Sequence, residues 1–309
     1  MNVPRKLPLL AAVLPLLLLA GCAGSRLVAM AQSGDLAGVQ ASLANGADVN
    51  ARDSSTGRTA LMNAAYYGHA DLAKYLLEHG ADVNAKNIDG STPLMYAAYH
   101  GYADIVQLLL AHGADVSAGN IKGWTPLMYA AYHGYADVAK DLLEHGADVN
   151  AKNDNGITAL MYAAYHGYAD IAKLLIDHGA DITATDAAGN SPFINAAGGD
   201  HANVLLLLLA HGADVNARDN NGVTALMNAS YYGYTDVLRI LIAHGANITE
   251  QTPKGVSALT NARLSNHPDI VQMLQTAAAN QTAQAPAADS SMPQNAPAPA
   301  AAQPWWQQQ

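Results

Sequence analysis

The sequence predicts an all-α fold built as a solenoid, in which short helical units repeat along the chain and stack on one another. The main observation is the segment LMYAAYHGYAD, which occurs identically at 94–104, 127–137 and 160–170 and therefore at a constant interval. Half of all residues are hydrophobic, which is enough for a continuous core. A unit of this length buries its apolar face against its neighbours, so we expect one elongated domain.

Residues 85–117 show how each unit is expected to fold. The unit opens with a turn in which Gly90 can adopt a positive φ. Thr92 and the proline after it begin a helix, because threonine caps exposed amides and proline suits the first helical position. Gly101 ends this helix in the left-handed conformation. A second helix with a leucine-rich face follows and closes at Gly113.

The same boundaries recur in every unit. Helix starts are marked at this constant interval by Thr59, Thr92, Thr125, Thr158, Ser191, Thr224 and Ser257. Second helices close at Gly46, Gly80, Gly113, Gly146, Gly179, Gly212 and Gly245. The first of these glycine intervals is longer than the others by one position, so the turn at 53–57 contains an extra residue.

In order, each unit carries T-P-L or a close variant, paired alanines, a glycine, a leucine run and G-A-D-V-N, and this pattern resembles the ankyrin repeat. The resemblance implies a solenoid of helix-turn-helix units with β-turn or hairpin fingers over residues 27–278. It divides this domain into an N-terminal cap (27–50), six repeats (51–84, 85–117, 118–150, 151–183, 184–216 and 217–249) and a C-terminal cap (250–278).

Two features depart from the ankyrin pattern. The family usually has a histidine directly after T-P-L that ties the turn together, and here that position holds Met62, Met95, Met128, Met161 and Met227. The hydrogen bond must be absent or replaced, and we expect these methionines to add core packing. In repeat 184–216, Gly198-Gly199-Asp200 replaces Tyr-His-Gly, which predicts an uneven surface.

Charge and cysteine content exclude several classes of function. The chain has a net charge of −10, which becomes −12 when segment 1–21 is removed, because this segment holds Arg5 and Lys6 but no acid. A surface of this sign repels phosphate backbones, so we expect no nucleic-acid partner. The single cysteine, Cys22, cannot form an internal disulfide or a four-cysteine metal site.

The N-terminus has the layout of a secretory signal peptide. Two basic residues precede an apolar run at 7–20, which is shorter than the roughly 20 residues that a membrane span needs. The run ends in Leu19-Ala20-Gly21-Cys22, which resembles the lipobox of bacterial lipoproteins. That resemblance implies removal of residues 1–21, lipidation of Cys22 and a short tether at 22–26. An ordinary cleaved signal with a chance cysteine is the alternative.

The residue after the cysteine bears on location. In Gram-negative lipoproteins an aspartate there retains the protein at the inner membrane, and this chain has Ala23. The resemblance therefore implies a cell-envelope protein, lipid-anchored at the periplasmic face of the outer membrane. At the other end, residues 279–309 are rich in Ala, Pro, Gln and Ser and are predicted to be disordered. They contain Trp305-Trp306, which is either a docking peptide or incidental.

The sequence contains no catalytic constellation, so we predict no enzyme and no cofactor. No serine lies in a G-x-S-x-G elbow, and neither an H-E-x-x-H motif nor a phosphate loop occurs. Six histidines precede the closing glycines, namely His79, His112, His145, His178, His211 and His244. One per repeat indicates a structural role rather than a metal site. The turns at 153–156 and 219–222 lack the carboxylate spacing of calcium loops.

The candidate binding surface lies at the end of the first helices. In ankyrin proteins the two residues before the helix-ending glycine face the concave groove. Here these are Tyr66, Tyr67, Tyr99, His100, Tyr132, His133, Tyr165, His166, Tyr231 and Tyr232. The turn tips add Ile88, Ile121, Trp124 and Ile157. Tyrosine and tryptophan give large contact area at low entropic cost, which suits a protein partner bound by a monomer. A cell-envelope glycan that stacks on the tyrosines is the alternative.

Two other tyrosine positions are interpreted as structural. Tyr96, Tyr129 and Tyr162 occupy a leucine position of the family and are expected to pack. Tyr102, Tyr135 and Tyr168 stand where the family often has histidine and are likewise assigned to the fold.

Overall fold

The computed structural model describes residues 25–284. The predicted signal peptide, Cys22 and residues 285–309 of the predicted tail lie outside this range. The chain divides into two compact units, residues 1–154 and residues 155–309, where the sequence predicts one elongated domain. All regular elements between residues 25 and 284 are helices, accompanied by three isolated antiparallel bridges in the fingers.

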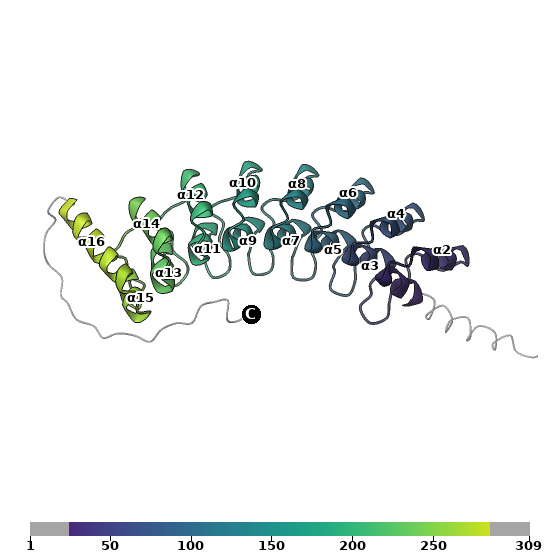
Figure 1. The fold of residues 1–309 in the computed structure, drawn as a ribbon, viewed down its shortest axis with the longest axis horizontal. Coiled ribbons are helices and arrows are strands. Elements are labelled where there is room, and N and C mark those ends of the chain that lie inside the picture. The colour runs from purple at the N-terminus through teal and green to yellow at the C-terminus, as the bar shows by residue number, and fades with distance from the viewer. Residues whose placement is uncertain (1–24, 285–309) are drawn as a thin grey trace, which may run out of the picture. The chain divides into compact units, whose positions relative to one another are not determined.

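The first unit holds the N-terminal cap and three repeats. Its cap consists of helical backbone at 25–33 and α2 (Leu36–Ala44). The first helices of its repeats are α3 (Ala60–Tyr67), α5 (Pro93–His100) and α7 (Pro126–His133). The second helices are α4 (Ala70–Glu78), α6 (Ala103–Ala111) and α8 (Ala136–Glu144). First helices pack on first helices and second on second, which produces two layers within the unit (Figure 1).

The second unit repeats this arrangement. Its first helices are α9 (Ala159–His166), α11 (Pro192–Gly198), α13 (Ala225–Tyr232) and α15 (Ala258–Leu264). Its second helices are α10 (Ala169–Asp177), α12 (Ala202–Ala210), α14 (Thr235–Ala243) and α16 (Pro268–Gln284). Because α16 continues to Gln284, the domain end predicted at residue 278 falls inside this helix. Between residues 25 and 284 we find no helix with the length and apolar character that a membrane crossing requires.

Helix starts follow the predicted capping chemistry. The Thr92 hydroxyl accepts a hydrogen bond from the amide of Met95 at 3.3 Å, which satisfies one of the free amides of α5. The same bond is made at the first helices by Thr59, Thr125, Thr158, Ser191, Thr224 and Ser257. These side chains fix where each first helix begins and therefore which residues reach its far end.

The methionines that replace the family histidine are core residues, as predicted. Met62, Met95, Met128, Met161 and Met227 are each at most 1% exposed. The hydrogen bond that the family histidine would make to the turn is replaced by one to the tyrosine that follows the methionine. The Tyr96 hydroxyl accepts from Asn87 Nδ2 at 3.0 Å, and the Tyr129 hydroxyl accepts from Asn120 Nδ2 at 3.1 Å. Because Oδ1 of each asparagine also accepts from finger amides, one side chain closes the finger and ties it to the helix.

Successive repeats meet at the glycine that ends each first helix. A β-carbon on Gly101, whose φ is 75°, would lie 2.6 Å from the ring of Tyr135. Gly68 and Tyr102 form the same pair in the preceding repeat, so these tyrosines serve the fold, as predicted. In the degenerate repeat of the second unit, Asp200 takes the glycine position with φ at 61°.

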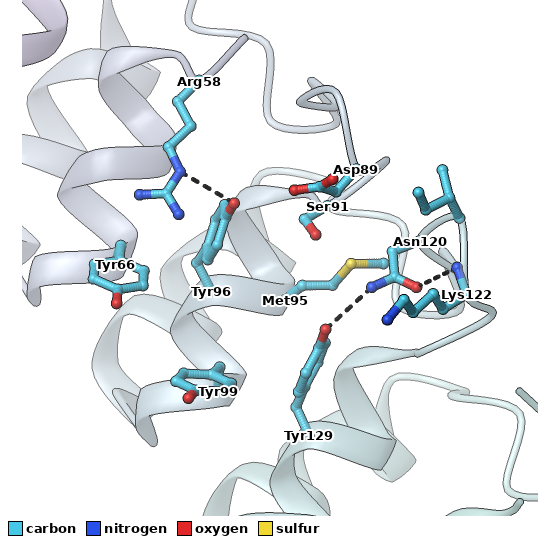
Figure 2. Close-up of a pocket in the computed structure, with 11 residues that line it drawn as sticks. Arg58, Tyr66, Asp89, Ser91, Met95, Tyr96, Tyr99, Asn120, Lys122 and Tyr129 are labelled. Atoms are coloured by element: carbon cyan, nitrogen blue, oxygen red, sulfur yellow. Dashed lines mark hydrogen bonds between the residues drawn. The ribbon is translucent and has the colours of Figure 1, made fainter. Parts of the chain in front are cut away.

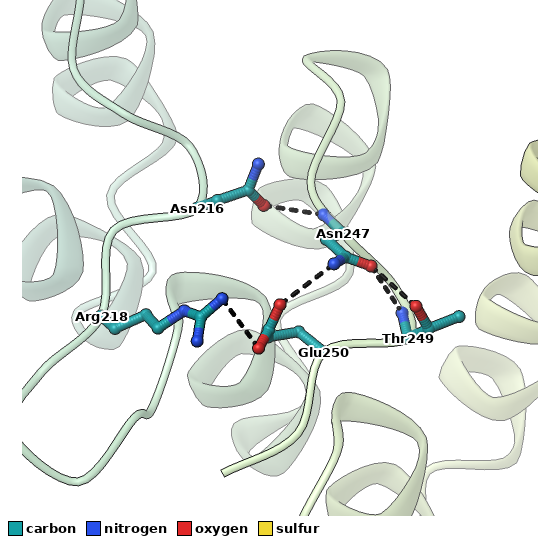
Figure 3. A network of polar contacts seen from close by, with 5 residues as sticks. All are labelled: Asn216, Arg218, Asn247, Thr249 and Glu250. Atoms are coloured by element: carbon teal, nitrogen blue, oxygen red, sulfur yellow. Dashed lines mark hydrogen bonds and ion pairs between the residues drawn. The ribbon is translucent and has the colours of Figure 1, made fainter. Parts of the chain in front are cut away.

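Neighbouring repeats are also joined by side chains between the fingers. Figure 3 shows the arrangement in the second unit, where Asn216 Oδ1 accepts from the Asn247 amide at 2.8 Å. An ion pair of 2.9 Å joins Arg218 to Glu250 beside it (Figure 3). In the first unit, Asn50 Oδ1 accepts from the amide of Asp82 at 2.7 Å. The asparagine bond recurs in other repeats, as at Asn84, and together with the ion pair it reinforces the stacking of the helices.

Two glycine substitutions should separate backbone strain from ring contact. Gly113→Ala places a β-carbon at φ 81° in open space, so it should lower the free energy of unfolding by about 1 kcal/mol. Gly101→Ala adds a clash with the Tyr135 ring and should lose roughly 1–3 kcal/mol more. Urea unfolding followed by circular dichroism measures both variants. Equal losses in the two would show that the ring contact does not set the repeat spacing.

Candidate functional site

The first unit carries a continuous chain of aromatic rings at the ends of α3, α5 and α7. We call its six members the aromatic ladder: Tyr67, Tyr66, His100, Tyr99, His133 and Tyr132. Successive ring centroids are 4.4–4.9 Å apart, and the ring planes cross at 69–83°. Aromatic rings attract one another in this edge-to-face geometry, so each ring helps to hold the next in place.

The ladder residues differ in how much surface they offer. Tyr67 and Tyr99 are each 39% exposed and Tyr132 is 38% exposed, whereas Tyr66 and the two histidines are half-buried. The sequence assigned both residues of each pair to the groove surface without distinction. The structure instead gives one tyrosine per repeat to solvent and packs its partner between the rings.

The ladder histidines are electrically neutral links. Nε2 of His100 and Nε2 of His133 are buried and have no hydrogen-bond partner. Burial lowers the pKa of both imidazoles below the ordinary value of 6.5, and His100 lowers that of His133 further. Both rings are therefore uncharged at neutral pH, and they contribute packing between tyrosines rather than charge.

A hollow of about 470 Å³ opens beside the ladder, between the fingers and the first helices (Figure 2). Its aromatic walls are Tyr66, Tyr96, Tyr99 and Tyr129, and its charged groups are Arg58, Asp89 and Lys122. Ligand sites are commonly hollows of this size that combine apolar walls with a few polar groups. The hollow therefore extends the ladder into a surface with both contact area and charge.

Sequence reasoning missed Arg58, which lies against the aromatic wall of the hollow. Its guanidinium carbon is 4.9 Å from the Tyr66 ring centroid and 4.7 Å from that of Tyr96. Its Nε donates to the Tyr96 hydroxyl at 3.2 Å (Figure 2). The sequence does contain a signal for Arg58. The residue before each helix cap varies between repeats that are otherwise similar. It reads Arg58, Ser91, Trp124, Ile157, Asn190, Val223 and Val256.

The predicted turn-tip residues divide into two groups. Ile88 and Ile121 are each 66% exposed, and Trp124 stacks on Tyr129 with centroids 4.9 Å apart. The assignment of Ile157 to the surface is wrong. It is only 8% exposed, because it packs with Met161, Ala184 and Tyr162 in a cluster of the second unit.

The second unit carries the remaining predicted pairs, all half-buried. Tyr165 meets His166 at 5.1 Å, and Tyr231 meets Tyr232 at 4.9 Å, both edge to face. Burial, reinforced by Tyr231, raises the pKa of the Tyr232 hydroxyl well above its ordinary value. The degenerate repeat between these pairs has glycines at both groove positions, so it adds no ring there.

Comparison with known proteins agrees with this architecture. A family model described as ankyrin repeats (3 copies) matches residues 27–120, 116–186 and 193–285, and one described as ankyrin repeats (many copies) matches residues 170–209. The chain belongs to the ankyrin-repeat family. Proteins of this family are generally protein–protein interaction modules without catalytic activity.

Individual ankyrin-repeat relatives match over about a fifth of this chain. The ankyrin repeat and SAM domain-containing protein 6 of Rattus norvegicus is 41% identical over 70 residues, which are 23% of this chain and 8% of the rat protein. The 2-5A-dependent ribonuclease of Mus musculus is 40% identical over 67 residues, 22% of this chain and 9% of the mouse protein. The chain thus spans less than a tenth of the length of these relatives, and the ribonuclease match covers only repeats.

The histidine column has a structural role in this ankyrin array. Nδ1 of each histidine lies 2.7–2.8 Å from the carbonyl oxygen four residues earlier, at His79, His112, His145, His178, His211 and His244. Each of these carbonyls also accepts from the backbone amide of the same histidine, so the ring adds a second contact at the end of the second helix. Residues 25–284 contain no cluster of three or more side chains suited to hold a metal ion.

The ladder histidines should make folding pH-dependent. Because their pKa values are lowered in the folded protein, the unfolded chain binds protons first as the pH falls through 6.5. The contribution of these two histidines to the free energy of unfolding is therefore fully present above pH 6.5. It declines as the pH falls toward 5. Urea unfolding at several pH values measures this decline, which His100→Phe with His133→Phe should reduce. A variant of the histidine column, His112→Gln, should retain it, and an unchanged decline in the double variant would contradict the assignment.

Proposed function

We propose that this ankyrin-repeat chain is a non-enzymatic module that captures a protein partner through the aromatic ladder and the adjacent hollow. The aromatic ladder is the observation that carries the proposal. It presents Tyr67, Tyr99 and Tyr132 to solvent at one ring per repeat. Their partners in the ladder already hold them in place, so little side-chain freedom remains to be lost on binding. Bound in this way, the partner is inhibited or held in position.

The geometry favours a protein over a glycan. Sugars stack on open ring faces, whereas the ladder rings meet edge to face, so neighbouring rings cover part of those faces. Proteins offer irregular apolar side chains that fit between such rings. The hollow adds Arg58, Asp89 and Lys122, and charges of both signs match the mixed side chains of a polypeptide.

We also propose that Cys22 is lipidated after removal of residues 1–21, with the chain held at the periplasmic face of the outer membrane. The supporting features are the apolar run, the small residues before Cys22 and the absence of an aspartate after it. Helical backbone already includes residues 25 and 26, which the sequence assigned to the tether. Two residues then separate the anchor from the helix, a span of at most about 7 Å. The chain's acidity gives no attraction to anionic lipid, so attachment depends on the lipid.

Removing two exposed ladder rings should abolish partner capture. Tyr99→Ala combined with Tyr132→Ala should weaken binding at least about 100-fold, since buried interface tyrosines often contribute about 2 kcal/mol each. The partner is first identified by crosslinking to the intact protein in envelope extract, and its affinity is then measured with each variant. Tyr75→Ala, on second helix α4 and outside the ladder, is the matched control. Capture that survives the double substitution, with normal circular dichroism in all variants, would remove the ladder from the binding site.

Membrane attachment should depend on one sulfur atom. Cys22→Ser should move the chain from the membrane pellet to the soluble fraction after cell lysis and ultracentrifugation. Intact-protein mass spectrometry should find lipid on the parent chain and none on the variant. Ala23→Ser, a substitution at the neighbouring position, should leave attachment unchanged. A pellet that retains the Cys22→Ser chain would show that another segment attaches it.

A further inference from the structure

The position before each helix cap distinguishes one repeat from the next in the first unit. The segment 94–104 is identical to 127–137, so the groove-facing rings of these repeats are the same. The residue before the cap is different in each repeat: Arg58, then Ser91, then Trp124. Arg58 and Ser91 line the hollow, and Trp124 packs on its wall residue Tyr129. The position before the cap is therefore one of the few places where the chemistry of the groove changes along the unit.

Arg58 is held in place with its charge unpaired. The rings of Tyr66 and Tyr96 flank the guanidinium, and Nε donates a hydrogen bond to the Tyr96 hydroxyl, as Figure 2 shows. Nη1 and Nη2 have no hydrogen bond or ion pair with any residue from 25 to 284. Arg218 of the second unit, by contrast, pairs with Glu250 at 2.9 Å. The side chain of Arg58 is thus ordered by its neighbours while the two nitrogens of its fork remain unbound.

The finger that holds Arg58 is itself well organised. This finger contains the extra residue, and the Asp53 carboxylate accepts from the amides of Ser55, Thr56 and Arg58 at 2.8, 2.7 and 3.0 Å. Burial alone would raise the pKa of Asp53, but hydrogen bonds from Thr56 and Ser55 outweigh it and hold the pKa well below the ordinary range. Because both Asp53 carboxylate oxygens already accept hydrogen bonds from backbone amides, Asp53 does not form an ion pair with the Arg58 guanidinium.

The free fork of an arginine matches one group above others. Two parallel N–H donors fit the two oxygens of a carboxylate, and such bonds are about twice as strong as neutral ones. Lys122 lines the same hollow, forms no ion pair with any residue from 25 to 284, and adds a second positive charge. Asp89, which has no ion pair within the described part of the chain, repels a second acid, so the acidic group of a ligand belongs at the Arg58 end. This charge arrangement complements an acidic side chain followed by uncharged residues.

We propose that the first unit binds an extended peptide segment of its partner, with an acidic side chain on Arg58 and an apolar side chain against Trp124. This assignment rests on the proposed function and names the chemistry of the bound segment. Arg58 and Trp124 are two repeats apart, and packed helices lie about 8–10 Å apart, which gives about 16–20 Å between the two contacts. An extended chain rises about 3.3 Å per residue, so the two side chains of the peptide are about five or six positions apart in its sequence.

Two blocked hexapeptides test the assignment on the full chain in detergent. Both end in leucine and have threonine and serine between, but one begins with glutamate and the other with glutamine. The glutamate peptide should bind about tenfold more tightly, the effect of one charge-assisted contact in a half-buried site. An NMR titration that follows the Arg58 Nε–H and Trp124 Nε1–H signals measures both affinities. Raising the salt concentration should reduce the ratio, because ions screen the pair.

Variants assign the preference to residues. Arg58→Gln should bring the ratio of the two affinities to about one, whereas Lys74→Gln, a matched loss of one charge on α4, should leave it unchanged. Arg58→Lys should keep only part of the preference, since the ammonium lacks the fork. Trp124→Ala should weaken both peptides equally. A glutamate preference that persists in Arg58→Gln would overturn the assignment.

The remaining outcomes separate this assignment from the proposed function. Equal binding of both peptides, lost on Tyr99→Ala with Tyr132→Ala, would overturn the carboxylate site while leaving a peptide-binding groove. If neither peptide binds and the full-length partner is still captured through the ladder tyrosines, the extended-segment assignment is wrong and the protein-binding function stands. If neither peptide binds and N-acetylglucosamine oligomers do, both the assignment and the proposed function are wrong.

Discussion

The structure depends on the missing β-carbon at the end of the first helices that close with a left-handed glycine, namely α3, α5, α7, α9 and α13. There the glycine adopts the left-handed conformation, and the ring of the next repeat occupies the space that a side chain would fill, as Tyr135 does at Gly101. This contact limits how closely two repeats approach. The glycine also fixes the end of the helix, so the two residues before it lie at the groove in each repeat that has this glycine. Stacking and presentation of the binding surface therefore have one physical cause.

The aromatic ladder extends this contact into a surface. Once the repeat spacing is set, the ring before one glycine lies within 4.4–4.5 Å of a histidine in the next repeat, as Tyr66 and Tyr99 do. A charged imidazole there would lack both water and a hydrogen-bond acceptor, because Nε2 is buried. Neutral histidine is thus the state compatible with the packing. The ladder combines rigidity with low charge, and the charge that a ligand meets comes from the fingers instead.

Much of the fold could be predicted from the sequence because it depends on local chemistry. Thr92 as a cap, Gly101 as a helix end and the buried methionines all follow from periodicity and residue type. Features that need two repeats in contact could not be predicted in this way. The ring contact and the hydrogen bond of Arg58 with Tyr96 join residues of two repeats. Ile157 was misassigned for the same reason, since neighbouring side chains bury it.

Repetition also limits what the ladder alone can specify. Identical groove residues at a constant period offer a partner equivalent positions in successive repeats, so the ladder supplies contact area without a unique register. Register must come from residues that do not repeat. In the first unit these include Arg58, Ser91 and Trp124, which differ in charge, size and polarity at one structural position. A duplicated scaffold can thus bind one partner in one alignment, because stability depends on the repeated residues and specificity on the few that differ.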